Sequence, residues 1–316
     1  MSSSHRGSSD GRAPWDSAHP GRSRARDFPM RSTDPTPTVR FGLLRQLTLL
    51  MSRDEFFAVL FILACVNGLG SQMVHSVRLS GWADALLSTF GISVIVWIAC
   101  FRGTRLILQE RTDKIRSVDL ALGLPLLLLI ALPIGRLSWL AITILSLYAL
   151  LFGDPSSSRR RGALILLAIT VPMLWSVLLS RYFANFILEI DASLIGWLLG
   201  TGNVGNVVRF ADQSGSLVIT PYCSSLANVS LAVLAWVTIS QWLPRRSSPK
   251  DLYWCFFAAT SVVAINVARI SLMGLSQMHY EAVHNQWIGA IANLLTLGLT
   301  VGFCLLGVKR EFFSRV

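Results

Sequence analysis

Charged residues are scarce in this sequence. Asp, Glu, Lys and Arg together make up 14% of the 316 residues, whereas a soluble domain usually carries about 25%. Apolar residues make up 53% of the chain, and its mean hydropathy is +0.55. This balance excludes an ordinary soluble domain. Because apolar runs of bilayer-spanning length recur along most of the chain, the sequence predicts an all-α, polytopic membrane protein.

The sequence also lacks the spacings that bind metals. It contains no CxxC pair, no Cys/His cluster with zinc-ligand spacing and no HExxH motif, so neither a metal site nor a disulfide framework is indicated. Four of the five cysteines, Cys65, Cys100, Cys255 and Cys304, fall inside apolar runs, where cysteine behaves as a small hydrophobe. Cys223 differs, because it stands where a polar segment runs into an apolar helix.

Aromatic/basic motifs of the kind that bind RNA are absent as well. The formal net charge is +11, but the basic residues gather in the N-terminal tail and in alternate loops. That distribution is how a membrane protein encodes its orientation. We therefore expect no nucleic-acid partner.

The first 40 residues lack an apolar period. Residues 1–40 are rich in Ser, Arg, Pro and Asp, which predicts a disordered, basic cytoplasmic tail, and they show no apolar core of a cleavable signal peptide. Residues 41–53 are mildly amphipathic and are predicted to lie on the membrane surface. Residues 54–316 form the predicted multi-pass membrane domain.

Apolar runs predict about eight transmembrane helices, each near the length that crosses a hydrocarbon core of ~30 Å. The predicted spans are 56–77, 84–101, 118–135, 137–153, 162–182, 226–243, 253–275 and 287–308. Basic residues gather in loops 102–117, 154–161 and 244–251 and at the C-terminus. An eight-span count places all of them on the side of the basic tail, so both termini are predicted to be cytoplasmic.

One long segment, 183–222, then falls on the outer side. Its first part, 186–200, is apolar but holds Glu189 and Asp191, so we expect it to be interfacial or re-entrant rather than spanning. Residues 205–220 contain two β-branched runs around an Asp-Gln-Ser-Gly turn, which predicts a small extracytoplasmic hairpin. That hairpin delivers the chain to the cysteine that precedes the next span.

Polar residues with catalytic potential converge on the outer face of this topology. Cys223 opens the sixth span, and Asn266 and Arg269 stand three residues apart near the outer end of the seventh, a spacing that places them on one helix face. His279 and His284 lie in the outer loop that follows. Each also has a structural alternative: a small buried hydrophobe for the cysteine, a headgroup anchor for the arginine, and an ordinary loop residue for either histidine.

These residue types together suit thiol chemistry. A cysteine acts as a nucleophile in its thiolate form, which a helix N-terminus and a nearby His or Arg favour, and Ser224 belongs to the first turn after Cys223. A histidine within reach can take the thiol proton and later protonate a leaving amine. An arginine supplies a fixed cation for a developing oxyanion, and Asn266 can orient either partner.

Three motifs carry a family resemblance. The stretches "CSSLANVSLAVL" (223–234), "NVARI" (266–270) and "HNQWIG" (284–289) resemble those of the exosortase/archaeosortase family, whose members are polytopic membrane cysteine transpeptidases with a Cys–Arg–His triad. The similarity extends over roughly residues 55–310. The family's usual Cys-Ser-Gly is Cys-Ser-Ser here, which leaves open the subfamily and the sorting signal that it recognises.

The resemblance implies a role for each triad position. Cys223 becomes the nucleophile, Arg269 the cation that stabilises the oxyanion or orients the substrate, and His284 the general acid and base. His279 fits the family pattern less well than His284, because the glycine five residues after His284 matches the family.

The resemblance also implies partners and a location. The expected substrates are exported membrane-anchored proteins whose C-terminal sorting signal combines a short motif, one transmembrane helix and a basic end. Cleavage is expected on the outer face of the cell membrane through a Cys thioester. The acyl group then passes to an acceptor such as an exopolysaccharide or a lipid, and no metal or organic cofactor is expected. The alternative from another class is a non-enzymatic polytopic membrane protein or a small-solute transporter.

Overall fold

The computed structural model describes most of the chain. The described residues are 51–109, 114–154, 157–221, 223–242, 249–283 and 286–313. The predicted tail, 1–40, and nearly all of the predicted surface segment, 41–53, lie outside them. Ser52 and Arg53 are described, and they open the first helix. The Ser52 hydroxyl accepts the Glu55 N–H at 3.2 Å and the Glu55 carboxylate accepts the Ser52 N–H at 2.9 Å, a reciprocal cap that fixes where the helix begins.

Helices dominate the described residues, as the sequence predicts. The helices are α2 (Arg53–Leu87), η1 (Thr89–Gly91), α3 (Val94–Ile107), α4 (Ser117–Ala131), α5 (Gly135–Leu151), α6 (Ser158–Thr170), η2 (Val171–Trp175), α7 (Ser176–Tyr182), α8 (Ala184–Leu199), α9 (Ser225–Ser240), α10 (Pro249–Met273), α11 (Gln277–Val283) and α12 (Gln286–Phe313), and the strands are β1 (Asn203–Val204), β2 (Val207–Arg209) and β3 (Ser216–Val218). Three helical stretches, Arg53–Leu87, Ser158–Tyr182 and Leu252–Met273, are long and apolar enough to cross a membrane by length and composition. They agree with a helical membrane protein, while the count of eight spans stays a prediction.

The predicted span 84–101 is wrong as one continuous helix. The chain leaves α2, turns through η1 and starts α3 only afterwards. Thr89, Phe90 and Gly91 all have positive φ angles, which an α-helix cannot contain. Apolar residues stand on both sides of this turn. Hydropathy averaged over the whole run therefore does not reveal the turn.

The predicted loops are shorter than expected. α3 continues to Ile107 into the predicted loop 102–117, and α6 already begins at Ser158 within the predicted loop 154–161. α11 occupies most of the predicted loop 276–286. Polar and basic residues propagate a helix almost as well as apolar ones do, so helices extend past the apolar runs that reveal them.

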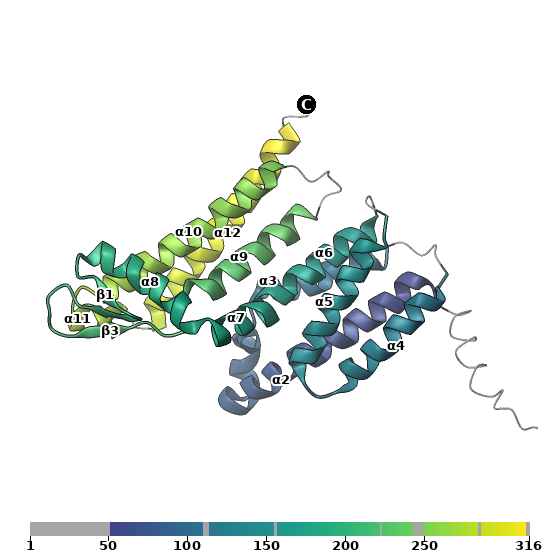
Figure 1. Cartoon of the computed structure of the whole chain (residues 1–316), viewed down its shortest axis with the longest axis horizontal. Helices are drawn as coiled ribbons and strands as arrows, with labels where there is room; N and C mark the ends of the chain where they lie inside the picture. The colour runs from purple at the N-terminus through teal and green to yellow at the C-terminus, as the bar shows by residue number, and fades with distance from the viewer. Residues whose placement is uncertain are drawn as a thin grey trace, which may run out of the picture. The chain divides into compact units, whose positions relative to one another are not determined.

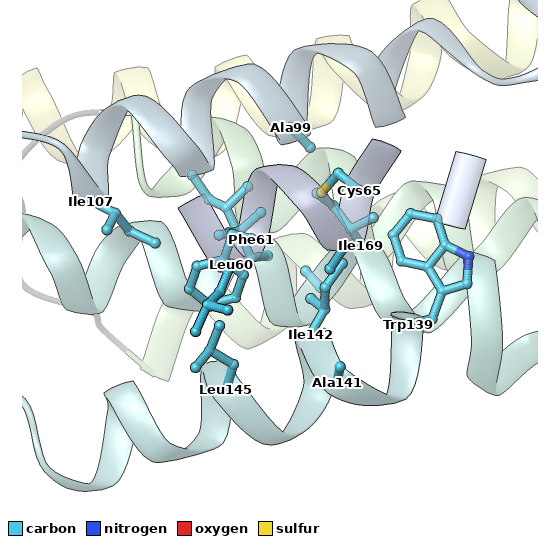
Figure 2. Packing of buried hydrophobic residues seen from close by; sticks show 14 of the residues in the cluster. Leu60, Phe61, Cys65, Ala99, Ile107, Trp139, Ala141, Ile142, Leu145 and Ile169 are labelled. Atoms are coloured by element: carbon cyan, nitrogen blue, oxygen red, sulfur yellow. The ribbon is translucent and has the colours of Figure 1, made fainter. Parts of the chain in front are cut away.

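Helices α2 to α6 share a continuous apolar core. Figure 2 shows part of it, with Phe61 of α2, Ile142 of α5 and Ile169 of α6 among the buried side chains. α3 and α6 meet at two glycines: a Cβ atom at Gly162 would lie 2.6 Å from the carbonyl oxygen of Gly103. The helices approach this closely because neither residue carries a side chain.

A cluster of buried charges joins four of these helices, and we call it the Asp119 network. Arg53 donates from Nε and Nη2 to the two carboxylate oxygens of Asp119 at 2.9 Å each. The Tyr148 hydroxyl donates to Asp119 at 2.7 Å, and Arg159 pairs with Asp54. From the sequence, Arg159 is only a loop charge that sets orientation. That interpretation is incomplete, because its side chain is 7% exposed and bound to a buried carboxylate.

Helices α9, α10 and α12 lie side by side in the second half of the chain (Figure 1). The predicted hairpin at 205–220 is confirmed: β2 and β3 pair antiparallel, with Val207 opposite Val218. β1 adds a short third strand that the sequence analysis does not predict, in the order β1-β2-β3. Segment 186–200 is helical as α8 up to its last residue, Gly200, which closes the helix in the left-handed conformation.

The turn of this hairpin is fastened to the end of α10. The Ala211 N–H donates to the Gly274 carbonyl oxygen at 2.9 Å, and the Asp212 N–H donates to that of Leu275 at 3.3 Å. Ile270 of α10 is buried in one apolar cluster with side chains of α8, β2 and β3. The strand that leads toward the candidate cysteine is therefore held against the helix that carries the candidate arginine.

Candidate active site around Cys223

Cys223 lies in a tight turn between the hairpin and α9. Its N–H donates to the Thr220 carbonyl oxygen at 2.9 Å, and the next N–H, of Ser224, donates to the Pro221 carbonyl oxygen at 3.3 Å. The Thr220 hydroxyl donates to the Cys223 sulfur at 3.5 Å. The half-buried side chain of Cys223 packs at the edge of the apolar cluster formed by α8, the hairpin and α10. The prediction that a hairpin presents the thiol at a helix start is confirmed.

Ser224 is the N-cap of α9. Its backbone is extended, at φ −65° and ψ 141°, and its hydroxyl accepts the Leu226 N–H at 3.3 Å, which is the role for which serine is favoured at this position. The preceding N–H of the helix, on Ser225, donates to a carboxylate oxygen of Asp191 at 3.1 Å. From the sequence, we expect the N–H groups of the first turn of α9 to stabilise a thiolate at Cys223. Two of its N–H groups instead have side-chain acceptors in the structure.

Asn266 connects α10 to the cysteine. Its amide nitrogen donates to the Cys223 carbonyl oxygen at 2.7 Å and to the Ser225 hydroxyl at 3.1 Å. The side chain is buried, and both amide hydrogens are used in these contacts. From the sequence, we predict that Asn266 orients a catalytic partner. In the structure, it holds the backbone of Cys223 and the side chain of Ser225, on either side of Ser224.

Arg269 lies one helical turn beyond Asn266 on α10. The residue is half-buried, and its Nε atom is buried without a hydrogen-bond partner among the described residues. Residues three apart on a helix have Cβ atoms about 5–6 Å apart, so Arg269 neighbours the amide that holds Cys223. A buried guanidinium N–H that lacks an acceptor is costly, and it can bind an acceptor that a ligand supplies. We call Cys223, Ser224, Ser225, Asn266 and Arg269 the Cys223 site.

The structure describes one of the two candidate histidines. His284 lies outside the described residues, between α11 and α12. His279 is exposed in the first turn of α11, where its Nδ1 lies 2.8 Å from the Ser276 hydroxyl and its N–H donates to that hydroxyl at 3.2 Å. Within the described ranges, the hydrogen bonds of His279 serve the start of α11 and do not reach Cys223.

One carboxyl near this end of the molecule has a perturbed pKa. The hydroxyl and the N–H of Ser214 bond to the side chain of Asp212, with the N–H at 2.9 Å, and these bonds hold the pKa of Asp212 below its ordinary value. The electrostatic effect of His279 on the pKa of Asp212 acts in the same direction. Asp212 lies fully exposed in the hairpin turn, so it stabilises that turn and takes no part in the Cys223 site.

Asp191 contacts the Cys223 site through the Ser225 N–H, and the sequence did not mark it as functional. From the sequence it was only an acid that argues against a membrane span. A carboxylate inside an apolar segment usually has a specific partner, and that principle could have identified it. Among the described residues, no three His, Cys, Asp or Glu side chains lie close enough together to hold a metal ion.

Comparisons of this chain with protein-family models, with curated proteins and with solved structures found no match.

Proposed function

We propose that this chain is a membrane-embedded cysteine transpeptidase of the exosortase type. The observation that carries the proposal is the junction between α9 and α10: Asn266 binds the backbone of Cys223 at 2.7 Å, and Arg269, one turn further along, keeps a buried guanidinium N–H without a partner in the described structure. A cysteine held at a helix start and a cation one turn from the residue that holds it supply the groups that nucleophilic attack on a carbonyl requires. The motif resemblance supplies the reaction and the third residue, His284.

The proposed reaction has two steps. In the first, His284 takes the thiol proton, the sulfur of Cys223 bonds to the carbonyl carbon of the scissile peptide, and Arg269 stabilises the oxyanion. The C–N bond then breaks, the leaving amine takes the proton, and a thioester remains. In the second, a hydroxyl, an amine or water attacks the thioester, and the thiol is regenerated with its proton.

The proposed setting is the outer face of a cell membrane, with eight spans and both termini in the cytoplasm. Substrates are exported proteins that end in a short motif, one transmembrane helix and a basic cluster. The hydrophobic helix holds the scissile bond near the bilayer surface, so the bilayer itself contributes to substrate concentration. An exopolysaccharide or a lipid at the same surface can then accept the acyl group.

The test follows a tagged protein with such a C-terminal signal, co-expressed with the full chain. The Cys223→Ala variant should abolish release of the C-terminal fragment. Cys100→Ala is the matched control, because Cys100 is also half-buried but lies on α3, and it should process the substrate normally. Normal processing by Cys223→Ala refutes the proposed function.

A transporter is the second candidate, and one cavity favours it. Between α3, α9 and α12 lies a space of about 300 Å³ lined partly by polar residues, among them Asn228, Thr296 and Thr300. Polar residues that line a cavity inside a membrane protein are typical of solute sites. Asn228→Leu should leave processing unchanged under the transpeptidase proposal. Formation of a covalent adduct at Cys223 with a thiol-reactive peptide mimic of the sorting signal also favours the transpeptidase over the transporter.

A further inference from the structure

Three arginines gather where α3 and α6 approach each other most closely. Arg102 directly precedes Gly103, and Arg161 directly precedes Gly162. A Cβ atom at Gly103 would lie 3.3 Å from the Gly162 carbonyl oxygen, so the two glycines bring the two arginines to one crossing point. Arg105 follows Arg102 by three residues and therefore neighbours it on the surface of α3.

These positive charges act on one another and lack a described counter-charge. Burial, and after it the positive charges of Arg105 and Arg161, hold the pKa of Arg102, which lies outside the predicted spans, below its ordinary value. None of the three arginines forms an ion pair within the described residues. The Nε atom of Arg102 and the Nη1 atom of Arg161 are buried there without a hydrogen-bond partner. Buried guanidinium N–H groups without acceptors cost free energy, and an anion that enters the cluster removes this cost.

The surroundings of Arg102 indicate the depth of this cluster in the membrane. Its Nη2 donates to the Trp242 carbonyl oxygen at 3.0 Å, and its guanidinium carbon lies 4.8 Å from the centroid of the Trp242 ring. Tryptophan rings are enriched at the level of the lipid headgroups. All three arginines belong to the basic loops that are predicted to be cytoplasmic, and anionic lipids concentrate in the cytoplasmic leaflet.

An apolar groove between α2 and α3 begins at the same cluster. It has a volume of about 590 Å³, and Arg105 is the charged residue of its mainly apolar lining, which includes Val66 of α2 and Phe101 of α3. The lining of α3 runs from Trp97 to Leu108. At 1.5 Å per residue this stretch is about 16 Å long, close to the depth of one leaflet of a hydrocarbon core of ~30 Å. The groove therefore suits an acyl chain whose headgroup lies at Arg105.

We propose that this is a lipid site: Arg102, Arg105 and Arg161 bind the phosphate of an anionic phospholipid, and one acyl chain of that lipid fills the groove between α2 and α3. Guanidinium groups match phosphate oxygens with paired, charge-assisted hydrogen bonds. A free phosphate ion would satisfy the arginines but would leave the groove empty. The site requires no catalytic activity, so it stands apart from the proposed function.

The experiment measures lipid binding to the purified full chain in detergent by native mass spectrometry. The two probes are dioleoyl phosphatidylglycerol and dioleoyl phosphatidylcholine, which share their acyl chains and differ in net headgroup charge. The phosphatidylglycerol should bind about tenfold more tightly, and inorganic phosphate should not displace it. Equal affinity for the two lipids refutes the anion site. Displacement by inorganic phosphate refutes the lipid and leaves a site for a free anion.

Charge variants test the cluster against diffuse surface charge. Arg102→Gln and Arg161→Gln should each lower the affinity for phosphatidylglycerol about three- to tenfold and leave that for phosphatidylcholine unchanged. Arg105→Gln changes an exposed side chain, so it gives the same reading if the other two variants fail to fold. Arg116→Gln is the matched control, because Arg116 is an exposed arginine of a loop on the same predicted side. An equal loss in Arg116→Gln overturns the proposal.

A groove variant tests the position of the acyl chain. Val66→Trp places a large ring in the groove and should lower the binding of both lipids. Val74→Trp is its control, because Val74 is also exposed on α2 but does not line the groove. Unchanged binding of phosphatidylglycerol in Val66→Trp, or an equal loss in Val74→Trp, shows that the acyl chain does not occupy the groove and refutes the proposed lipid site.

Discussion

The Asp119 network and the Cys223 site differ in whether the buried guanidinium nitrogens of their arginines have hydrogen-bond acceptors. In the network, the guanidinium of Arg53 meets both oxygens of a carboxylate at 2.9 Å each. In the site, Arg269 is half-buried, and its enclosed Nε has no acceptor among the described residues. A paired buried charge stabilises one arrangement of helices, whereas an unpaired one costs free energy until something binds it. The first arrangement serves folding and the second is suited to a ligand.

Breaking the network should give the largest change in stability. Asp119→Asn removes the charge that compensates Arg53 and weakens the acceptor of the Tyr148 hydroxyl. Loss of one partner from a buried ion pair typically costs about 3–5 kcal/mol. We expect a loss of this size in the thermal unfolding of the purified chain in detergent. Processing of a co-expressed substrate should be retained by the folded protein.

The double variant Arg53→Met with Asp119→Leu is the control for this prediction. Replacing both members of a buried pair by apolar residues is often nearly neutral, so the double variant should recover much of the lost stability. If Asp119→Asn melts like the wild type, the network contributes nothing to folding and the contrast between the two regions disappears.

The same substitution at two arginines tests the comparison directly. Lysine keeps the charge and loses the planar fork, so Arg269→Lys should lower processing about 10²-fold, which corresponds to about 2.7 kcal/mol of transition-state stabilisation. Its melting temperature should change little. Arg53→Lys should behave in the reverse manner, losing about 1.5–3 kcal/mol of stability with processing retained in the folded fraction. These values come from parallel unfolding and processing assays.

Two results would contradict the proposed difference between Arg269 and Arg53. If Arg269→Lys processes the substrate at the wild-type rate, the fork is not needed and Arg269 is a membrane anchor, as its structural alternative holds. If both variants lose stability alike, Arg269 belongs to the fold, and the proposed contrast between folding charge and ligand charge is wrong.

The sequence identified the site better than it identified the network. Asn266 and Arg269 stand out locally, because two polar residues three apart in an apolar helix share a face. The hairpin at 205–220 was predictable from β-branched runs around a turn. The network joins Arg159 to Asp54 over 105 residues, and no local pattern encodes which loop charge meets which buried carboxylate.

The contact of Asp191 with the Cys223 site and the helix α11 escaped prediction for different reasons. The contact of Asp191 with the Ser225 N–H spans 34 residues, and it depends on how α8 packs on α10. α11 escaped because seven residues are too few for a periodic pattern, and a Ser276 cap is not distinctive on its own. Local chemistry therefore predicted the residues, whereas tertiary packing decided their partners.

A smaller effect is expected at the amide that joins α10 to the cysteine. Asn266→Asp exchanges a donor for an acceptor, so a carboxylate oxygen then faces the Cys223 carbonyl oxygen, at a place where the amide nitrogen donates at 2.7 Å. An unsatisfied buried group of this kind costs about 1–3 kcal/mol. We expect faster amide hydrogen exchange at the start of α9, with the exchange of α2 and α5 unchanged. Asn203→Asp is the control, because the half-buried amide of Asn203 on β1 also donates to a backbone carbonyl oxygen, that of Gly205. Equal exchange at α9 in Asn266→Asp and the wild type would show that the bonds of Asn266 to Cys223 and Ser225 do not stabilise the start of α9.

The smallest effect should come from a carboxylate that is exposed. The folded pKa of Asp212 lies below its ordinary value, chiefly because of its bonds to Ser214. The stabilisation that this carboxyl gives to the hairpin turn is therefore present above the ordinary pKa, near pH 4. It is lost as the pH falls through the lowered folded pKa. Amide exchange of Ser214 should rise over that interval in the wild type. In Asp212→Asn the pH-dependent part should vanish, and melting at neutral pH should shift far less than in Asp119→Asn. A large loss of stability in Asp212→Asn would show that the exposed carboxylate of Asp212 matters to the fold as much as the buried carboxylate of Asp119.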